Sequence, residues 1–206
     1  MSDRDVYRTL AGAGEARFEV RGSAFIGHAT PVETREAADA FVDAIEAEYA
    51  DATHNVPAYR VRVESGQSGH LLREYQSDDG EPTGSSGKPA LNVLQQQDIE
   101  NVAVVVTRYY GGTNLGVGGL ARAYSRAVKE AVADAGVVEQ RPREDFAVTV
   151  EYDDSGTVRG ILESTDVDFE ADYETDVHFA VTAPVEDAPG IRDRIRSATS
   201  GRATIE

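Results

Sequence analysis

The chain of 206 residues contains no cysteine. This absence excludes a disulfide framework, a thiol nucleophile and a thiolate metal site. No apolar run approaches the roughly 18 residues that a membrane-spanning helix needs. The first residues, MSDRDVYRTL, contain no signal-peptide core. The sequence therefore predicts a soluble cytoplasmic protein without a membrane partner.

Lysine is scarce, because only Lys88 and Lys129 occur in the whole chain. The 37 acidic residues outnumber 20 basic ones, and the formal net charge is -17. A strongly acidic, lysine-poor surface stays hydrated in concentrated salt, so the composition indicates a halophilic, haloarchaeal cell. Most of the charge is therefore attributed to habitat rather than to a basic partner. At molar salt the Debye length is about 3 Å, so long-range steering is weak.

The charge is unevenly distributed along the chain, whose length allows one large or two small domains. Residues 145–206 carry a net charge of -10, whereas residues 1–144 carry -7. The polar segment 140–144 contains a proline and is typical of a linker. We therefore expect one domain at 1–140 and another at 145–206.

The first part alternates strand and helix patterns. Phe18 and Val20 alternate with charges, and the run 24–28 follows a turn. A helix is expected from Thr34, a plausible N-cap, with one apolar stripe at 38, 41, 42, 45 and 49. Residues 59–63 alternate apolar residues with arginine and predict a half-buried strand, followed by a turn at 65–69 and a partner strand at 71–76.

The continuous apolar run 102–107 predicts a buried central strand. A helix then follows from Leu120 to Ala135, with Gly136 at its C-terminus. Strands and helices in this order indicate an α+β domain.

The second part has a clearer pattern. Its expected elements are a strand at 146–152, a helix at 154–164, strands at 167–173 and 177–183, a helix at 187–198 and a strand at 203–205. This βαββαβ order predicts a ferredoxin-like domain.

A positive segment interrupts the acidic chain. Residues 101–129 contain no Asp or Glu but contain Arg108, Arg122, Arg126 and Lys129. Residues 116–121 satisfy the dinucleotide fingerprint, but seven residues separate them from Arg108 and no βαβαβ series surrounds them. The glycines near the helix start favour an anion site. Alternatively, they form only a tight connection between strand and helix.

The segment 76–89 contains three clustered carboxylates, from Asp78, Asp79 and Glu81. These could hold magnesium. They could equally form a turn, with Ser86 capping a helix that runs toward Leu94. The Walker pattern is absent, because a proline follows Lys88.

A second, less acidic region surrounds His54. It includes Arg60, Arg62, His70 and Arg73. His54 either begins a site or is a buried or capping histidine. A Ser/His/Asp triad has no nucleophile-elbow pattern to support it.

Four motifs resemble those of the IMPACT/YigZ family. They stand here as Ser23–Ala29 (Ser-x-Phe-Ile-x-x-Ala), 52–54 (Ala-x-His), Asp78–Pro82 (Asp-Asp-Gly-Glu-Pro) and Arg108–Tyr124. Two mild departures are Tyr110 in place of phenylalanine and Ser85-Ser86 in place of Thr-Ala.

The resemblance implies an N-terminal domain like the second domain of ribosomal protein S5. It also implies a C-terminal domain like the last domain of elongation factor G, which agrees with the βαββαβ pattern. Eukaryotic relatives are translation regulators that compete for the activator of a starvation-sensing kinase. Because they carry an additional N-terminal interaction domain, that specific role is not expected of this chain.

From these features we expect a non-enzymatic protein that binds RNA or the ribosome and modulates translation. Arginines would contact phosphates and tyrosines would stack on bases. The expected RNA or anion surface consists of Arg108, Tyr109, Gly111, Gly112, Gly116, Gly118, Gly119, Arg122 and Arg126. The family-motif residues without an expected role are His54, Arg60, Asp78, Asp79, Gly80, Glu81, Pro82 and Gly84.

Two other classes of function remain open. The first is an enzyme that holds magnesium beside a phosphate on the glycine loop. The second is a protein adaptor in translation or stress regulation. No resident cofactor is expected under the main hypothesis.

Overall fold

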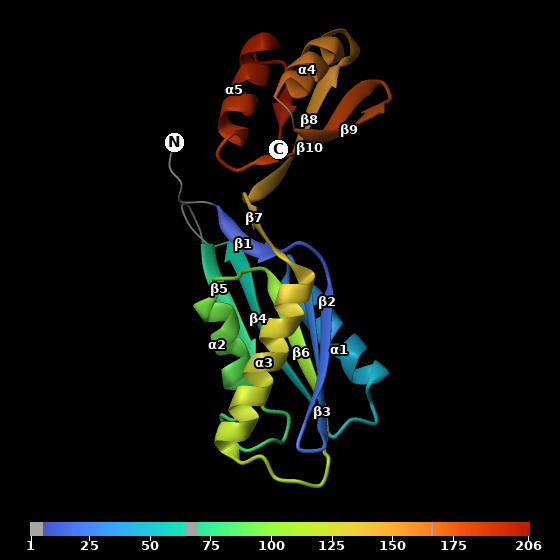
Figure 1. Ribbon diagram of the computed structural model, residues 1–206. Helices are drawn as coiled ribbons and strands as arrows, with labels where there is room; N and C mark the ends of the chain where they lie inside the picture. The colour runs from blue at the N-terminus through green and yellow to red at the C-terminus, as the bar shows by residue number, and fades with distance from the viewer. Residues whose placement is uncertain (1–5, 65–69, 166) are drawn as a thin grey trace. The chain divides into compact units, whose positions relative to one another are not determined.

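The computed structural model describes residues 6–64, 70–165 and 167–206 (Figure 1). The chain divides into two compact units after Gln140. The first unit is Tyr7–Gln140, and the second contains Arg141–Glu206. The boundary falls in the segment where the charge pattern changes.

The first unit is built on a five-stranded antiparallel sheet with the order β2-β3-β6-β4-β5. Its strands are β2 (Gly14–Val20), β3 (Ser23–Pro31), β4 (His54–Glu64), β5 (His70–Gln76) and β6 (Val102–Tyr109). The first seven residues of β6 are all buried, which confirms the predicted central strand.

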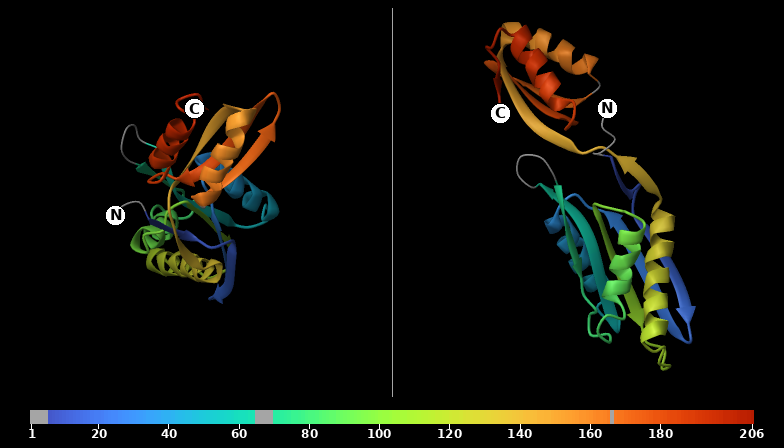
Figure 2. Two further views of the ribbon diagram at one scale, coloured as in Figure 1. Left: turned by 90° about the horizontal axis from the view of Figure 1, so that it is seen from above. Right: turned by 90° about the vertical axis from the view of Figure 1, so that its left-hand side faces the viewer.

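Helices cover both faces of this sheet. Helix α1 (Arg35–Glu48) lies on one face, and α2 (Gly87–Gln96) and α3 (Val117–Ala135) lie on the other (Figure 2). The hydroxyl of Thr34 accepts a hydrogen bond from the Ala37 amide at 3.1 Å, which confirms the predicted N-cap. Gly136 ends α3 with a φ of 73°, a conformation that glycine adopts without strain.

The strand predicted at 59–63 is confirmed as part of β4, but the prediction that it is half-buried is wrong. Tyr59 and Val61 pack beneath α1, whereas Arg60 points to the other face and is only 6% exposed. Arg60 donates to the Leu94 and Ile99 carbonyl oxygens, and Glu74 pairs with it at 2.8 Å. An arginine in an alternating pattern suggests a solvated face, but here its charge is buried and compensated.

A small second sheet was not predicted. It pairs β1 (Tyr7–Leu10) with β7 (Val137–Gln140) in antiparallel register. Both strands have four residues, too few for a period-two pattern to identify them. The expected turn at 65–69 lies outside the described residues.

The second unit is a four-stranded antiparallel sheet with the order β11-β8-β10-β9. Its elements are β8 (Arg143–Glu151), α4 (Tyr152–Ser164), β9 (Asp168–Tyr173), β10 (Asp176–Pro184), α5 (Ala188–Ala198) and β11 (Thr204–Ile205). This order and pairing confirm the ferredoxin-like βαββαβ prediction. Among the described residues of the chain, no helix is sufficiently long and apolar to cross a membrane.

Candidate functional site

A buried ion pair joins two of the sequence motifs. Strand β6 carries Arg108, whose Nη1 donates to Glu81 Oε1 at 2.5 Å. The two residues are only 4% and 8% exposed. Tyr124 of α3 donates to the same oxygen at 2.8 Å, and His54 Nε2 lies 3.9 Å from Glu81 Oε2. We call Glu81, Arg108, Tyr124 and His54 the Glu81 cluster.

The expectation that Arg108 faces a phosphate is therefore corrected. Its guanidinium is enclosed between the sheet and α3 and is neutralised by Glu81. The sequence could not show this, because the partner carboxylate lies 27 residues away in the chain. Arg108 holds the fold together rather than presenting charge to solvent.

Asp78 organises the loop that precedes α2. Its carboxylate accepts hydrogen bonds from the Gly84, Ser86 and Gly87 amides and from the Ser86 hydroxyl. Burial alone would raise the pKa of the Asp78 carboxyl, but these hydrogen bonds outweigh it and the pKa is lowered. Ser86 makes no side-chain cap of its own. Ser86 is the N-cap residue of α2, as predicted, but Asp78 rather than the Ser86 side chain satisfies the free amides at the helix start.

The three clustered carboxylates do not share a ligand. Asp79 Oδ2 accepts from the Asn55 amide at 2.6 Å, whereas the Asp79 carbonyl oxygen lies 2.6 Å from His54 Nδ1. Asp78 and Glu81 are held by the separate donors described above. Within the described ranges, no group of three or more metal-ligating side chains converges. The proposed magnesium site at 78–81 is therefore not formed by these three residues.

Turn geometry accounts for the other residues of this motif. Asp79, Gly80 and Gly84 have φ values of 46°, 80° and 75°, in the region that favours glycine. Pro82 is exposed. Gly80 and Gly84 thus shape the loop that delivers Glu81 to Arg108.

The glycine loop includes one very close backbone contact. A Cβ atom on Gly111 would lie 1.9 Å from the Gly22 carbonyl. Gly112 and Gly116 have φ values of 81° and 71°, whereas Gly118 and Gly119 lie in the first turn of α3. Gly111, Gly112 and Gly116 support the reading of a tight connection between strand and helix.

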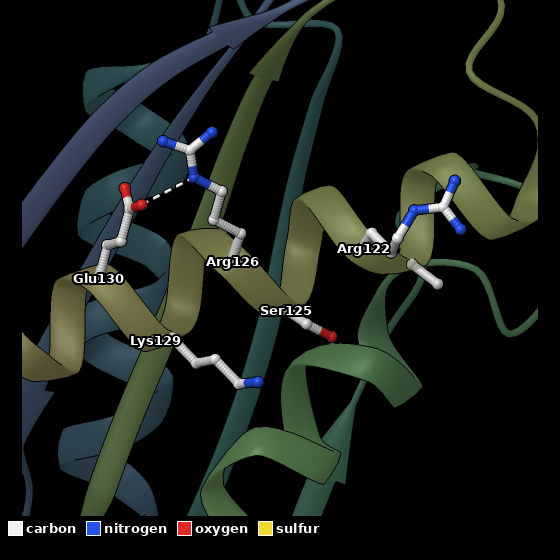
Figure 3. A pocket seen from close by; sticks show the side chains of 6 residues that line it. Arg122, Ser125, Arg126, Lys129 and Glu130 are labelled. Atoms are coloured by element: carbon white, nitrogen blue, oxygen red, sulfur yellow. Dashed lines mark hydrogen bonds and ion pairs between the residues drawn. The ribbon is translucent and has the colours of Figure 1, made fainter.

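The remaining cations lie on the exposed side of α3 (Figure 3). Arg122, Arg126 and Lys129 line a shallow groove there. Arg126 pairs with Glu130 at 2.7 Å and lies 4.0 Å from the centre of the Phe18 ring. Arg122 and Lys129 make no hydrogen bond or ion pair within the part of the chain that the structure describes.

Lys88 belongs to the same side of the unit. It is exposed at the start of α2, and the carbonyl oxygen of the next residue, Pro89, accepts a hydrogen bond from Ser125 of α3 at 3.3 Å. We call Lys88, Arg122, Arg126 and Lys129 the α3 face. Lys88 was not predicted to belong to this surface. In the sequence it was considered only as part of a Walker motif, which the proline after it excludes. The scarcity of lysine could have pointed to it, since both lysines of the chain lie on this face.

Tyr109 does not belong to the α3 face. Along β6, Val104 and Val106 pack with α3, so the alternation turns Val105 and Tyr109 to the α1 side. The Tyr109 hydroxyl donates to Asp51 at 2.7 Å. The expectation that Tyr109 stacks on bases beside the arginines is corrected, because the sheet separates them.

Removing the Tyr124 hydroxyl changes the stability at high pH. Burial, followed by the charge of Glu81, raises the pKa of the Tyr124 phenol. Above about pH 10, the unfolded chain loses this proton while the folded chain keeps it. The free energy of unfolding thus falls by about 1.4 kcal/mol per pH unit there. We expect Tyr124→Phe to lose this part of the slope, and to cost about 1–3 kcal/mol at neutral pH because Glu81 loses a donor.

Urea denaturation between about pH 9 and 11 measures this difference. Tyr110→Phe is the matched control, because Tyr110 is 46% exposed. An alkaline slope equal in wild type and Tyr124→Phe would contradict the assignment.

The comparisons with known proteins agree with the motifs. Residues 21–132 match the model of the Impact N-terminal domain, and residues 148–202 match a domain of unknown function, DUF1949. IMPACT family member YvyE of Bacillus subtilis is 33% identical over 97% of this chain and 90% of its own. IMPACT family member YigZ of Escherichia coli is 34% identical over 81% of this chain and 80% of its own.

A solved structure also extends over both units. It is titled a crystal structure of an hypothetical protein and is 28% identical, covering 98% of this chain and 96% of its own, with a TM-score of 0.69. The family model alone matches more than half of the residues, and the YvyE alignment runs through both units. The chain therefore belongs to the IMPACT family.

Proposed function

We propose that this protein binds RNA through the α3 face and acts on the ribosome in translation, without catalysing a reaction. The observation that carries the proposal is the position of the rare cations. Both lysines and two arginines lie on α3 and the start of α2. Residues 82–97 and 101–129 contain no acidic residue, although the chain has 37.

The first unit is electrically polarised across its sheet. Helix α1, on the opposite face, contains Glu36, Asp39, Asp43, Glu46 and Glu48 but only one basic residue, Arg35. A polyanion is therefore attracted to one face of the sheet and repelled from the other. Helix α3 also carries Glu130 and Asp134, but its three basic residues leave it with a net charge of +1, against -4 for α1.

The chemistry of the α3 face suits phosphates rather than bases. Arg122, Arg126 and Lys129 span eight residues of helix, or about 10 Å along its axis. The nearby Phe18 ring lies beneath the Arg126 guanidinium, and Tyr124 is buried. Guanidinium and ammonium groups then contact the RNA backbone, which fixes position without reading sequence.

Family membership supports a role in translation. The eukaryotic relatives to which the motifs point are translation regulators. The resemblance of the first unit to a domain of ribosomal protein S5 also favours the ribosome as the place of binding. Asp78, Asp79 and Glu81 each have separate hydrogen-bond partners, and this supports the present proposal over the magnesium-enzyme alternative.

Neutralising the α3 face tests the proposal. We expect Arg122→Gln/Lys129→Gln to weaken RNA binding about tenfold or more, and to reduce the slope of log affinity against log salt by about two. Fluorescence anisotropy with labelled ribosomal RNA fragments measures both quantities. Sedimentation with purified ribosomes measures retention on the particle.

Arg17→Gln/Arg35→Gln is the matched control, because it removes the same charge from the α1 side of the same unit. Equal loss of RNA binding in the two double variants would contradict the assignment of RNA binding to the α3 face. If the protein retains a protein partner after nuclease treatment and has no affinity for RNA, the result would instead support the alternative function as a protein adaptor.

A further inference from the structure

The edge strand β5 exposes two large apolar side chains on one face. Helix α1 packs on β6 and β4, whereas β5 ends the sheet and pairs only with β4 among the described residues. The register places Tyr75 opposite Tyr59, which packs beneath α1. Leu71, Arg73 and Tyr75 therefore share the α1 side of β5, and Leu71 and Tyr75 are 60% and 45% exposed.

A groove of about 370 Å³ lies between this strand and α1. Tyr75, Pro57 and Val42 supply its apolar lining. The Tyr75 ring is stacked on Tyr59 with 5.1 Å between their centres, which holds Tyr75 in place. A rigid aromatic ring at the edge of a groove is a common anchor for a protein segment.

Carboxylates line the opposite wall of the groove. Asp43 and Glu46 of α1 point their charge into it together with Asp39 and Asp79. Asp43 and Glu46 have no hydrogen bond or ion pair with any residue in the described ranges. Burial, followed by repulsion from Asp79 and Asp43, raises the pKa of the Glu46 carboxyl. Asp43 and Glu46 therefore lie among other carboxylates and have no cation of their own in the described ranges, whereas Asp39 pairs with Arg35 at 3.2 Å.

We infer that this groove docks an extended, basic segment of a partner protein, which adds to the sheet along β5. The free edge supplies backbone donors and acceptors for an added strand. Alternate side chains of that strand reach the same face. Apolar ones would contact Leu71 and Tyr75, and arginine or lysine side chains would reach Asp43 and Glu46. This surface is separate from the α3 face, on the other side of the sheet.

The charge of the groove can be tested in the full chain. The probe is a short synthetic peptide with the repeat Arg-Ser-Val-Ser, which places arginine and valine on the same face of an added strand, and its counterpart replaces arginine with glutamate. Binding is measured by fluorescence anisotropy at molar salt, where the Debye length of about 3 Å leaves only close contacts. We expect the basic peptide alone to bind, and Asp43→Asn/Glu46→Gln to weaken it about tenfold. Glu33→Gln/Glu36→Gln, with the same charge change outside the groove, should change binding less than about twofold.

The strand addition needs a second readout. We expect Tyr75→Ser and Leu71→Ser each to weaken peptide binding about tenfold, whereas Tyr152→Ser, at a 66% exposed tyrosine of the second unit, leaves binding unchanged. Amide resonances of β5 should shift when the peptide is added. Equal binding of both peptides, or equal binding to wild type and Asp43→Asn/Glu46→Gln, would overturn the inference. Binding of spermidine at the groove without any peptide effect on β5 would also overturn it, since the groove would then serve a small cation.

Discussion

Replacing Glu81 with glutamine is expected to lower the free energy of unfolding by about 3–5 kcal/mol. The change leaves the Arg108 guanidinium buried without its counter-charge. The Ser23 hydroxyl, 3.3 Å from Nη2, is a neutral acceptor, and Arg108 Nε already has no hydrogen-bond partner among the described residues. No second carboxylate of the described residues forms an ion pair with Arg108 that could replace Glu81.

A double-mutant cycle separates the pair from the rest of the fold. Because breaking a buried pair costs more than replacing both partners with apolar residues, Glu81→Gln/Arg108→Met should be more stable than Glu81→Gln alone. Urea denaturation, followed by amide resonances of the first unit, measures each corner of the cycle. Glu130→Gln breaks the exposed pair with Arg126 and should cost less than about 1 kcal/mol. If the effects of Glu81→Gln and Arg108→Met are additive and Glu81→Gln lowers the free energy of unfolding by less than about 1 kcal/mol, the assignment of a buried ion pair would be contradicted.

The Glu81 cluster also explains why its motifs are widely spaced in the sequence. His54 begins β4, Glu81 lies in the loop before α2, Arg108 ends β6 and Tyr124 lies on α3. One buried carboxylate therefore ties the helix layer to the sheet. Of these residues only Arg108 was expected at a binding surface, and His54 and Glu81 had no expected role; together with Tyr124 they instead form the buried contact that positions the α3 face.

The parts of the fold that the sequence predicted are those with local periodicity. The apolar run of β6 and the stripe of α3 specify their own burial, because each repeats with the period of its element. The βαββαβ order of the second unit follows from similar patterns. Short strands such as β1 were missed, since their pairing with β7 joins Tyr7 to Gln140 and leaves no local pattern.

The site was predictable only for residues that act locally. Arg122, Arg126 and Lys129 share a helical face, and spacing alone shows this. Arg60 and Arg108 were misjudged because burial depends on carboxylates and carbonyl groups distant in sequence. The sequence identifies a charged residue, but its exposure depends on the partners that the fold brings to it.

Replacing Gly27 with alanine is expected to cost about 3 kcal/mol, at the upper end of the cost of overpacking. A Cβ atom on Gly27 of β3 would lie 2.4 Å from the Ala127 carbonyl oxygen of α3 and 2.9 Å from its carbon. These are backbone atoms, so no side chain can rotate away and the helix itself must move. Gly14 of β2 is equally close to Ala131, and α3 therefore lies on the sheet along a seam of small residues.

Displacing α3 has a consequence beyond stability, because the α3 face and the Tyr124 contact to Glu81 move with it. Gly27→Ala should thus lower both the free energy of unfolding and the affinity for RNA, measured by urea denaturation and by anisotropy. Gly160→Ala is the matched control: Gly160 lies within α4 and has nothing within 4 Å of the added Cβ. Since alanine is the better helix former, it should stabilise the second unit by about 0.5–1 kcal/mol. If the Gly27→Ala variant is as stable as wild type, α3 can move away from β3 without lowering the free energy of unfolding. The close contact between Gly27 and Ala127 would then not be what positions the α3 face.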